Sequence, residues 1–241
     1  GAPNTGKSAI VATATHAATK VADYPYTTAI PLPGMAQFED VQIELVDTPP
    51  VTPEHVPTGV MGTIRNADVV CVVVEAGDAA LEQVEMVLSV LGARGLKLRP
   101  AARNELPPGD ASQRPGLILA AKTDLASTGA IGALRELYAG RLEVVGVSAR
   151  TGEGLDDWFT RLWAMLAMIR VYSKEPGRPP DMHKPFIVPA GATVSELARQ
   201  IHRDLPEPMK FARLWGHSRF EGQQVHKTEP LRDRDVVEIH E

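Results

Sequence analysis

The sequence is poor in cysteine, in aromatic residues and in long apolar runs. Its single cysteine, Cys71, excludes a disulfide within the chain and favours a reducing, cytoplasmic setting. Its longest apolar runs, 69–74 and 162–169, are far shorter than the roughly 20 residues that span a bilayer, so we expect no membrane partner. Its 241 residues are enough for one large or two modest globular domains. A composition of 44% hydrophobic and 23% charged residues is typical of globular proteins and excludes a wholly disordered chain.

The excess of acidic over basic residues lies in the first three quarters of the chain. The formal net charge is −5, from 25 Lys and Arg against 30 Asp and Glu. Residues 184–241 hold nine basic and nine acidic residues, so the acidic excess lies entirely in residues 1–183. We expect a first domain at 1–173, a polar, proline-containing linker at 174–183 and a second domain at 184–241.

The chain opens on a glycine-rich pattern. Residues 1–8 read Gly-Ala-Pro-Asn-Thr-Gly-Lys-Ser and match G-x-x-x-x-G-K-[ST] from their first position. In such a phosphate loop, backbone N–H groups converge on the phosphates, the lysine reaches the β and γ oxygens, and the serine hydroxyl binds Mg²⁺. The simpler alternative is a glycine-rich turn before a helix.

A phosphate loop normally follows a buried strand, and no residues precede this one. We therefore expect an N-terminally truncated fragment whose sheet lacks its first strand. Such a gap exposes two interior strand edges, so we expect residues 1–241 alone not to fold stably.

Strand and helix patterns alternate through the middle of the chain. They predict strands at 41–46, 69–74, 117–120 and 144–147, helices at 81–91 and 155–166, and a loop at 95–116. This alternation is typical of a three-layer α/β domain with a mostly parallel sheet. Asp47, Asp124 and Ser148 each follow one of these strands, where α/β folds place ligand sites.

The pattern changes after residue 183. Residues 186–188, 211–215 and 236–239 are predicted strands, and a capping box at 193–196 opens a helix with a buried stripe of Val194, Leu197, Ala198, Ile201 and Leu205. One helix among short strands predicts a small α+β module.

These motifs together resemble a Ras-like GTPase of the translation-factor-related class, and within it the Obg and developmentally-regulated GTP-binding (DRG) proteins. Residues 22–28 resemble the first switch of Obg proteins, and residues 210–216 and 231–239 resemble a DRG-type TGS domain, a ubiquitin-like β-grasp unit. The resemblance implies a Ras-like P-loop NTPase domain followed by a TGS domain. It also implies a cytoplasmic regulatory GTPase that uses GTP and Mg²⁺, with K⁺ as a further ion, and contacts ribosomes or RNA through its TGS domain rather than DNA.

The resemblance also assigns residue roles. It implies that Ser8 and Thr28 ligate Mg²⁺, that Asp47 acts on the metal through water, and that Asn4 accompanies K⁺-stimulated hydrolysis. Asp124 would accept from the N–H donors of guanine, which adenine cannot offer as a pair. The full implied nucleotide-binding set is Asn4, Thr5, Gly6, Lys7, Ser8, Tyr26, Thr27, Thr28, Asp47, Lys122, Asp124, Ser148 and Ala149.

Three positions depart from the family pattern. Pro50 replaces the glycine whose N–H bonds the γ-phosphate, and such a bond is worth roughly 1.5–3 kcal/mol. We expect GTP to lose about tenfold to a hundredfold of its preference over GDP, unless another donor substitutes. Ala121 replaces the asparagine of the base-reading motif, which predicts weaker binding with guanine preference kept. Val51 stands where Ras-like enzymes carry a water-orienting glutamine, so no catalytic side chain is assigned.

Two functional hypotheses remain open. One is a slow GTPase, and the other is a nucleotide-sensing module that holds guanine nucleotide and barely hydrolyses it. A general P-loop ATPase is a weaker third, against which Asp124 and the first switch argue.

The basic residues of the C-terminal module have two interpretations. They predict an RNA-binding face or a solvated mixed surface with equal weight; they are Arg199, His202, Arg203, Lys210, Arg213, His217 and Arg219. Trp215 is expected in the core, and the histidines are too scattered for metal-ligand spacing.

Overall fold

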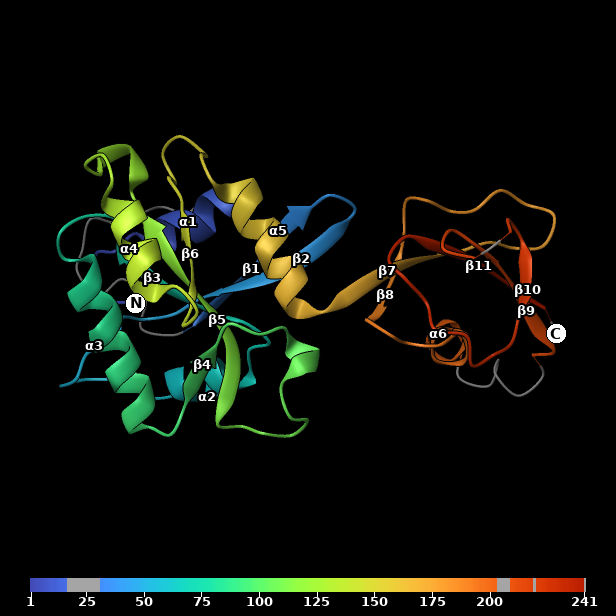
Figure 1. Cartoon of the computed structure of the whole chain (residues 1–241), viewed down its shortest axis with the longest axis horizontal. Helices are drawn as coiled ribbons and strands as arrows, with labels where there is room; N and C mark the ends of the chain where they lie inside the picture. The colour runs from blue at the N-terminus through green and yellow to red at the C-terminus, as the bar shows by residue number, and fades with distance from the viewer. Residues whose placement is uncertain (17–30, 203–208, 219, 241) are drawn as a thin grey trace. The chain divides into compact units, whose positions relative to one another are not determined.

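The computed structural model describes residues 1–16, 31–202, 209–218 and 220–240. The chain divides into two compact units. The first unit comprises Gly1–Phe38 with Gln42–Leu166, and the second comprises Glu39–Val41 with Ala167–Glu241. Their helices and strands can be followed in Figure 1, and each unit is described by itself.

The first unit contains a four-stranded parallel sheet. It is formed by β3 (Val70–Glu75), β4 (Lys97–Arg99), β5 (Gln113–Ala121) and β6 (Glu143–Gly146). β5 pairs in parallel with each of the other three strands. β3 is a run of β-branched residues that alternate between the two faces of the sheet, with Val72 and Val74 on one face and Val73 on the other.

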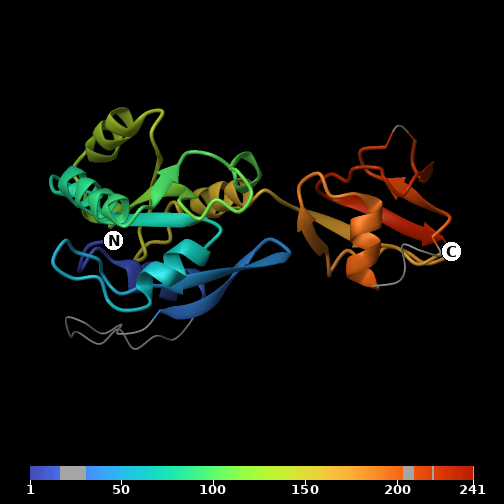
Figure 2. The ribbon, with the colours of Figure 1, turned by 90° about the horizontal axis from the view of Figure 1, so that it is seen from below.

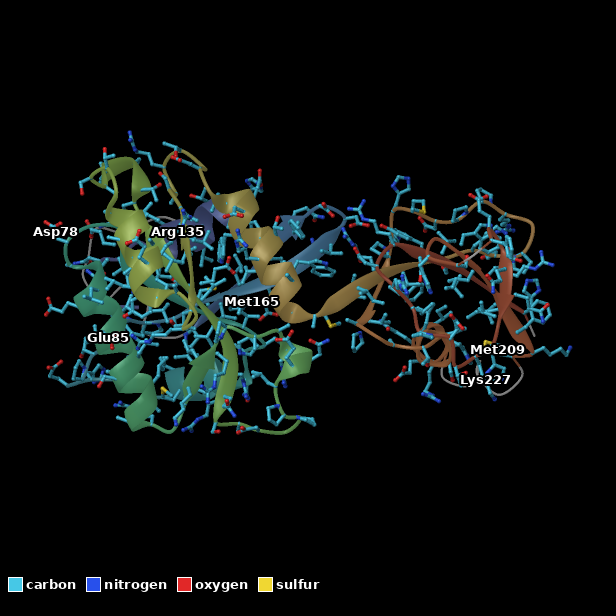
Figure 3. The ribbon with its side chains drawn as sticks, in the orientation of Figure 1. Asp78, Glu85, Arg135, Met165, Met209 and Lys227 are labelled. Atoms are coloured by element: carbon cyan, nitrogen blue, oxygen red, sulfur yellow. The ribbon has the colours of Figure 1, made fainter. Side chains whose placement is uncertain are left out.

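Helices cover both faces of this sheet (Figures 1 and 2). α2 (Val60–Asn66), α3 (Ala80–Ala93) and α4 (Ala130–Tyr138) pack on the face that carries Val72. α1 (Lys7–Ala14) and α5 (Leu155–Leu166) pack on the face that carries Val73, and Met165 of α5 lies in this layer (Figure 3). The predicted three-layer α/β architecture is confirmed.

The prediction of a loop at 95–116 is wrong. This segment contains β4, the 3₁₀ helix η1 (Arg103–Glu105) and the start of β5. Lys97–Arg99 pairs with residues 113–115, and Pro115 is tolerated inside β5 although it cannot donate to a ladder. A three-residue strand is too short for its side-chain alternation to stand out in a sequence.

A slot separates β2 (Val41–Asp47) from β3. In the described part of the chain, β2 pairs only with β1 (Leu32–Phe38), and β3 pairs only with β5. The cavity between them measures about 620 Å³ and is lined by residues 43–48 on one side and 66–73 on the other. Because consecutive residues line it on both sides, strand edges rather than a single face border the slot. Gly1, the first residue of the phosphate loop, also lines the slot.

Filling this slot is expected to stabilise the first unit. A six-residue Val/Ile-rich segment joined to Gly1 would pair with both edges, and each buried Val or Ile contributes about 1.5–3 kcal/mol before chain-ordering costs. We expect the melting temperature to rise by about 10 °C or more in a thermal unfolding experiment. A Ser/Asp-rich segment of the same length is the control, and equal melting temperatures for the two extended proteins would contradict this expectation.

The second unit contains a five-stranded mixed sheet. Its strands, in spatial order, are β10 (Gln223–Val225), β9 (Phe211–Trp215), β11 (Asp235–His240), β7 (Met168–Ser173) and β8 (Phe186–Pro189). β11 runs parallel to β7, and the other neighbours are antiparallel. This arrangement confirms the predicted β-grasp fold. Since β7 pairs with both β8 and β11, the residues before 174 already belong to this sheet.

One helix, α6 (Val194–Ile201), covers one face of this sheet (Figure 2). Its predicted capping box is confirmed, because Thr193 and Glu196 bond each other's backbone N–H groups. Val194 and Leu197 belong to one buried core with Ala212 and Leu214 of β9 and with Met209 (Figure 3). Trp215 is not part of this core. It lies half-buried on the outer face, where the Lys174 ammonium is 4.9 Å from its ring centroid.

Candidate nucleotide-binding site

The phosphate-loop residues form a turn that is closed by its own hydrogen bonds. Gly6 has φ +91° at the N-cap of α1, a left-handed conformation that favours glycine, and no side chain caps the helix there. The buried Thr5 hydroxyl and the Lys7 ammonium both donate to the Ala2 carbonyl, at 3.1 and 2.6 Å. The first N–H groups of α1 therefore point out of an uncapped helix start, which is a favourable environment for an anion.

The end of β2 meets this turn through one side-chain hydrogen bond. The Ser8 hydroxyl donates to a carboxylate oxygen of Asp47 at 2.6 Å, and Asp47 is 7% exposed. A hydroxyl and a carboxylate are hard oxygen donors of the type that Mg²⁺ accepts, and Mg²⁺ commonly keeps several waters beside one or two protein ligands. The donor set therefore fits the implied metal. Within the described residues, no group of three or more His, Cys, Asp or Glu side chains could hold a metal ion.

The base-reading motif lies after β5. One Asp124 carboxylate oxygen accepts from the Ser148 hydroxyl at 2.6 Å, and the other accepts from Arg150 Nε at 2.7 Å. These two hydrogen bonds, that from Ser148 first, lower the pKa of Asp124, so this side chain is an ionised acceptor. Ser148 is fully buried, and the Ala149 carbonyl accepts from Thr13 of α1 at 3.1 Å. The base-reading loop is thereby tied to the helix that begins in the phosphate loop.

Lys122 connects the two ends of the site. It has φ +60°, and its ammonium forms an ion pair with Glu75 at 2.6 Å. A Cβ added to Gly6 would lie 3.8 Å from the Ala121 methyl group and 4.0 Å from Cε of Lys122. The base-reading motif thus packs directly against the phosphate loop, although Ala121 offers no polar side chain there.

The structure brings most of the expected residues to one edge of the sheet. Ser8 and Asp47 meet at the phosphate end, while Asp124 and Ser148 meet at the base end. Asn4 is exposed in the loop, and the expected Tyr26, Thr27 and Thr28 lie outside the described residues.

Three further side chains complete this picture. Val51, at the glutamine position, is 2% exposed in the core that includes α2 and α3. Sequence reasoning missed the Arg150 and Glu75 ion pairs. The available signals were the arginine that follows Ser148-Ala149 and the carboxylate that ends β3.

Comparison with known proteins gives matches over both units. Residues 1–100 match the family model described as "50S ribosome-binding GTPase", and residues 169–241 match the TGS domain model. An uncharacterized GTP-binding protein of Halobacterium salinarum is 26% identical, over 99% of this chain and 81% of that protein. Developmentally-regulated GTP-binding protein 2 of Mus musculus is also 26% identical, over 99% of this chain and 80% of that protein. Both alignments are longer than this chain, so the relatives carry residues within them that have no counterpart here.

Two solved structures share the fold. The GTP-binding protein from Pyrococcus horikoshii OT3 superposes with a TM-score of 0.61 at 17% identity, over 99% of this chain and 97% of that one. The structure of the Schizosaccharomyces pombe YchF GTPase superposes with a TM-score of 0.67 at 11% identity, over 99% of this chain and 96% of that one. At these identities the structures establish the fold alone.

The fold and the matches define a P-loop GTPase domain joined to a TGS domain. Within that class, the chain is similar over its full length to the developmentally-regulated GTP-binding (DRG) proteins, of which it is a distant relative. None of the described helices combines the length and the apolar character that crossing a bilayer requires.

Lys7 is expected to make phosphate binding sensitive to pH. Burial lowers the pKa of its ammonium to about 8, against the opposing effect of Asp47. The phosphates require the charged form, so above pH 8 binding must also protonate this side chain. We expect GDP affinity to be about tenfold lower at pH 9 than at pH 7, measured by titration calorimetry. GMP, which lacks the β-phosphate, serves as the control ligand. A GDP affinity that stays flat over this range would contradict the assignment of Lys7.

Proposed function

We propose that this protein is a Mg²⁺-dependent, K⁺-stimulated regulatory GTPase that hydrolyses GTP to GDP and phosphate. The observation that carries the proposal is the hydrogen bond between Ser8 and Asp47, which joins the phosphate loop to a carboxylate at the end of a strand. The buried, oriented Asp124–Ser148 pair at the same edge supports guanine as the base.

The phosphates are held by this chain's own groups. The N–H groups at the start of α1 and the Lys7 ammonium supply positive charge, and Lys7 lies partly buried where that charge is poorly screened. Ser8 would hold Mg²⁺, with Asp47 acting through water and Thr28, which lies outside the described residues, as the expected further ligand. When bound, the metal neutralises negative charge on the phosphate oxygens. Asn4 remains the candidate for the K⁺ effect.

The base is selected by hydrogen-bond pattern. Asp124 offers two ionised carboxylate oxygens, which suit the paired N–H donors of guanine, and Ser148 fixes the orientation of this carboxylate. Each Asp124 oxygen already accepts one hydrogen bond, from Ser148 or from Arg150, and has a second lone pair that can accept from a guanine N–H. Ala149 and Lys122 would flank the base from the adjoining loops.

Hydrolysis has no side chain that we can name as a water-orienting group. Val51 is buried in the core, so its side chain cannot reach a γ-phosphate. Pro50 has no N–H to donate to this phosphate. Turnover would rest on clamped phosphates and metal ions and is expected to be slow without an activating partner.

The alternative is a guanine-nucleotide-sensing module with little turnover. Pro50 and Ala121 are the residues that would allow it, because each lacks a polar group that binds the nucleotide in related sites. With either function, we expect the protein to act in the cytoplasm, as its single cysteine indicates, and to have ribosomes or RNA as its partner.

A single-turnover experiment separates the two functions. Protein in excess over radiolabelled GTP, with Mg²⁺, is followed for bound GTP and for GDP formed. We expect conversion that is faster in K⁺ than in Na⁺. Bound GTP that stays intact even with ribosomes would favour the nucleotide-sensing module, and absence of GTP binding would contradict both.

Pro50→Ala refines this experiment. The substitution restores an N–H at the second switch, so the preference for GTP over GDP should rise about tenfold or more. Pro53→Ala is the matched control, since Pro53 is exposed in the same segment and lies outside the motif. Equal nucleotide preferences in both variants and the parent would show that another donor already serves the γ-phosphate.

A further inference from the structure

A cluster of basic side chains lies in the first unit, away from the nucleotide site. It comes from the ends of α2 and α3, from β4, from η1 and from the start of β5, which lie together in Figure 1. We call it the basic patch, and its members are Arg65, Arg94, Lys97, Arg99, Arg103 and Arg114. The patch stands out because residues 1–183 are acidic overall.

Hydrogen bonds hold the inner part of this patch together. Arg65 donates to the Arg94 carbonyl at 2.5 Å, and Arg114 donates through two nitrogens to the Arg65 carbonyl. Arg94 donates to the Val90 carbonyl in the last turn of α3 at 3.1 Å. Carbonyls at helix C-termini carry partial negative charge, which explains how these guanidinium groups are tolerated side by side.

Carboxylates do not neutralise the patch. In the part of the chain that the structure describes, Arg103 alone among its members has an ion pair, a 3.7 Å contact with Asp68. Glu105 caps η1, and Asp110 accepts hydrogen bonds from Ser112 and Gln113 that lower its pKa to about 2. Three nearby carboxylates therefore face six cations, and the outer members Lys97 and Arg99 are exposed.

The position of the patch excludes the nucleotide as its ligand. Arg114 lies at the amino end of β5, whereas Asp124 follows the carboxyl end of the same strand. At about 3.3 Å per residue, a strand of this length separates the two by more than 20 Å. An anion bound at the patch is therefore a second ligand.

Polyanion chemistry fits this surface better than a protein interface does. Arginine forks recognise phosphate in a bidentate manner. Protein interfaces are built around an apolar centre, and none of the exposed large hydrophobic residues of the described chain falls within 94–114. The phosphate backbone of a nucleic acid needs no such centre.

We propose that the basic patch binds the phosphate backbone of RNA. The inference rests on the proposed RNA association and assigns it to the GTPase unit as well as to the TGS domain. In the second unit, Arg199 is on the exposed side of α6, while Arg213 lies between Ala212 and Leu214 and faces away from that helix. Arg199 and Arg213, both expected on one basic face of the TGS domain, thus lie on two different faces.

The test removes the two exposed cations. Lys97→Glu/Arg99→Glu is compared with the parent protein in fluorescence anisotropy titrations of a 20-nucleotide oligouridine RNA from 50 to 200 mM KCl. Each lost phosphate contact lowers the salt slope of log Kd by about 0.7 for a single strand, so we expect a slope reduced by about 1.4. We also expect Kd to rise about tenfold at the lower salt concentrations, where counterion release is largest.

Lys210→Glu/Arg213→Glu, the control variant, makes the same charge change in the second unit, so it separates the contribution of the TGS domain to RNA binding from that of the basic patch. GTP affinity and the far-UV circular dichroism spectrum are measured for both variants and are expected to be unchanged; the first reports on the fold of the GTPase unit and the second on the fold of both units. If the parent binds RNA and only the control variant loses affinity, the patch proposal fails while the RNA association stands. If the parent binds no RNA, the association and the patch fail together and the GTPase proposal is untouched. Equal binding of polyglutamate and RNA would also overturn the proposal.

Discussion

The hydrogen bond between Ser8 and Asp47 is the constraint on which the phosphate end of the site depends. It joins two segments that are 39 residues apart and fixes the start of α1 against the end of β2. It also places a carboxylate near the Lys7 ammonium, which opposes the lowering of its pKa by burial. A hydroxyl, a carboxylate and a cation are thus gathered at an uncapped helix start, where a phosphate finds most of its partners already positioned.

A second contact holds the segment after Asp47 against the phosphate loop. The segment after Asp47 carries Pro49 and Pro50, and its next residue, Val51, is anchored in the core. This anchoring keeps the second switch close to the phosphate loop, since the Val51 N–H donates to the Gly1 carbonyl at 3.3 Å. This segment therefore lacks a hydrogen-bond donor for the γ-phosphate, because the prolines have no N–H and the valine side chain is apolar.

Much of the fold could be predicted because its signals are local. The β-branched run of β3, the capping box of α6 and the polar residues after three strands all have periods or spacings visible in sequence. β4 and β7 were missed for different reasons. β4 is three residues long, and β7 begins two residues after α5, so its alternation of Ile169 and Val171 was hidden by the preceding helix pattern. The Arg150–Asp124 pair joins two loops, and its contact exists only in three dimensions.

The central claim is that Ser8 and Asp47 form the metal end of a nucleotide site. It is tested most directly by the GTP affinity of the parent protein and of Ser8→Ala, each measured with Mg²⁺ and with EDTA. The parent is expected to lose about tenfold or more of its affinity in EDTA, whereas Ser8→Ala should bind weakly in both, and Ser8→Thr, which keeps the hydroxyl, should behave like the parent. A Ser8→Ala variant with the full Mg²⁺ dependence of the parent would contradict the account.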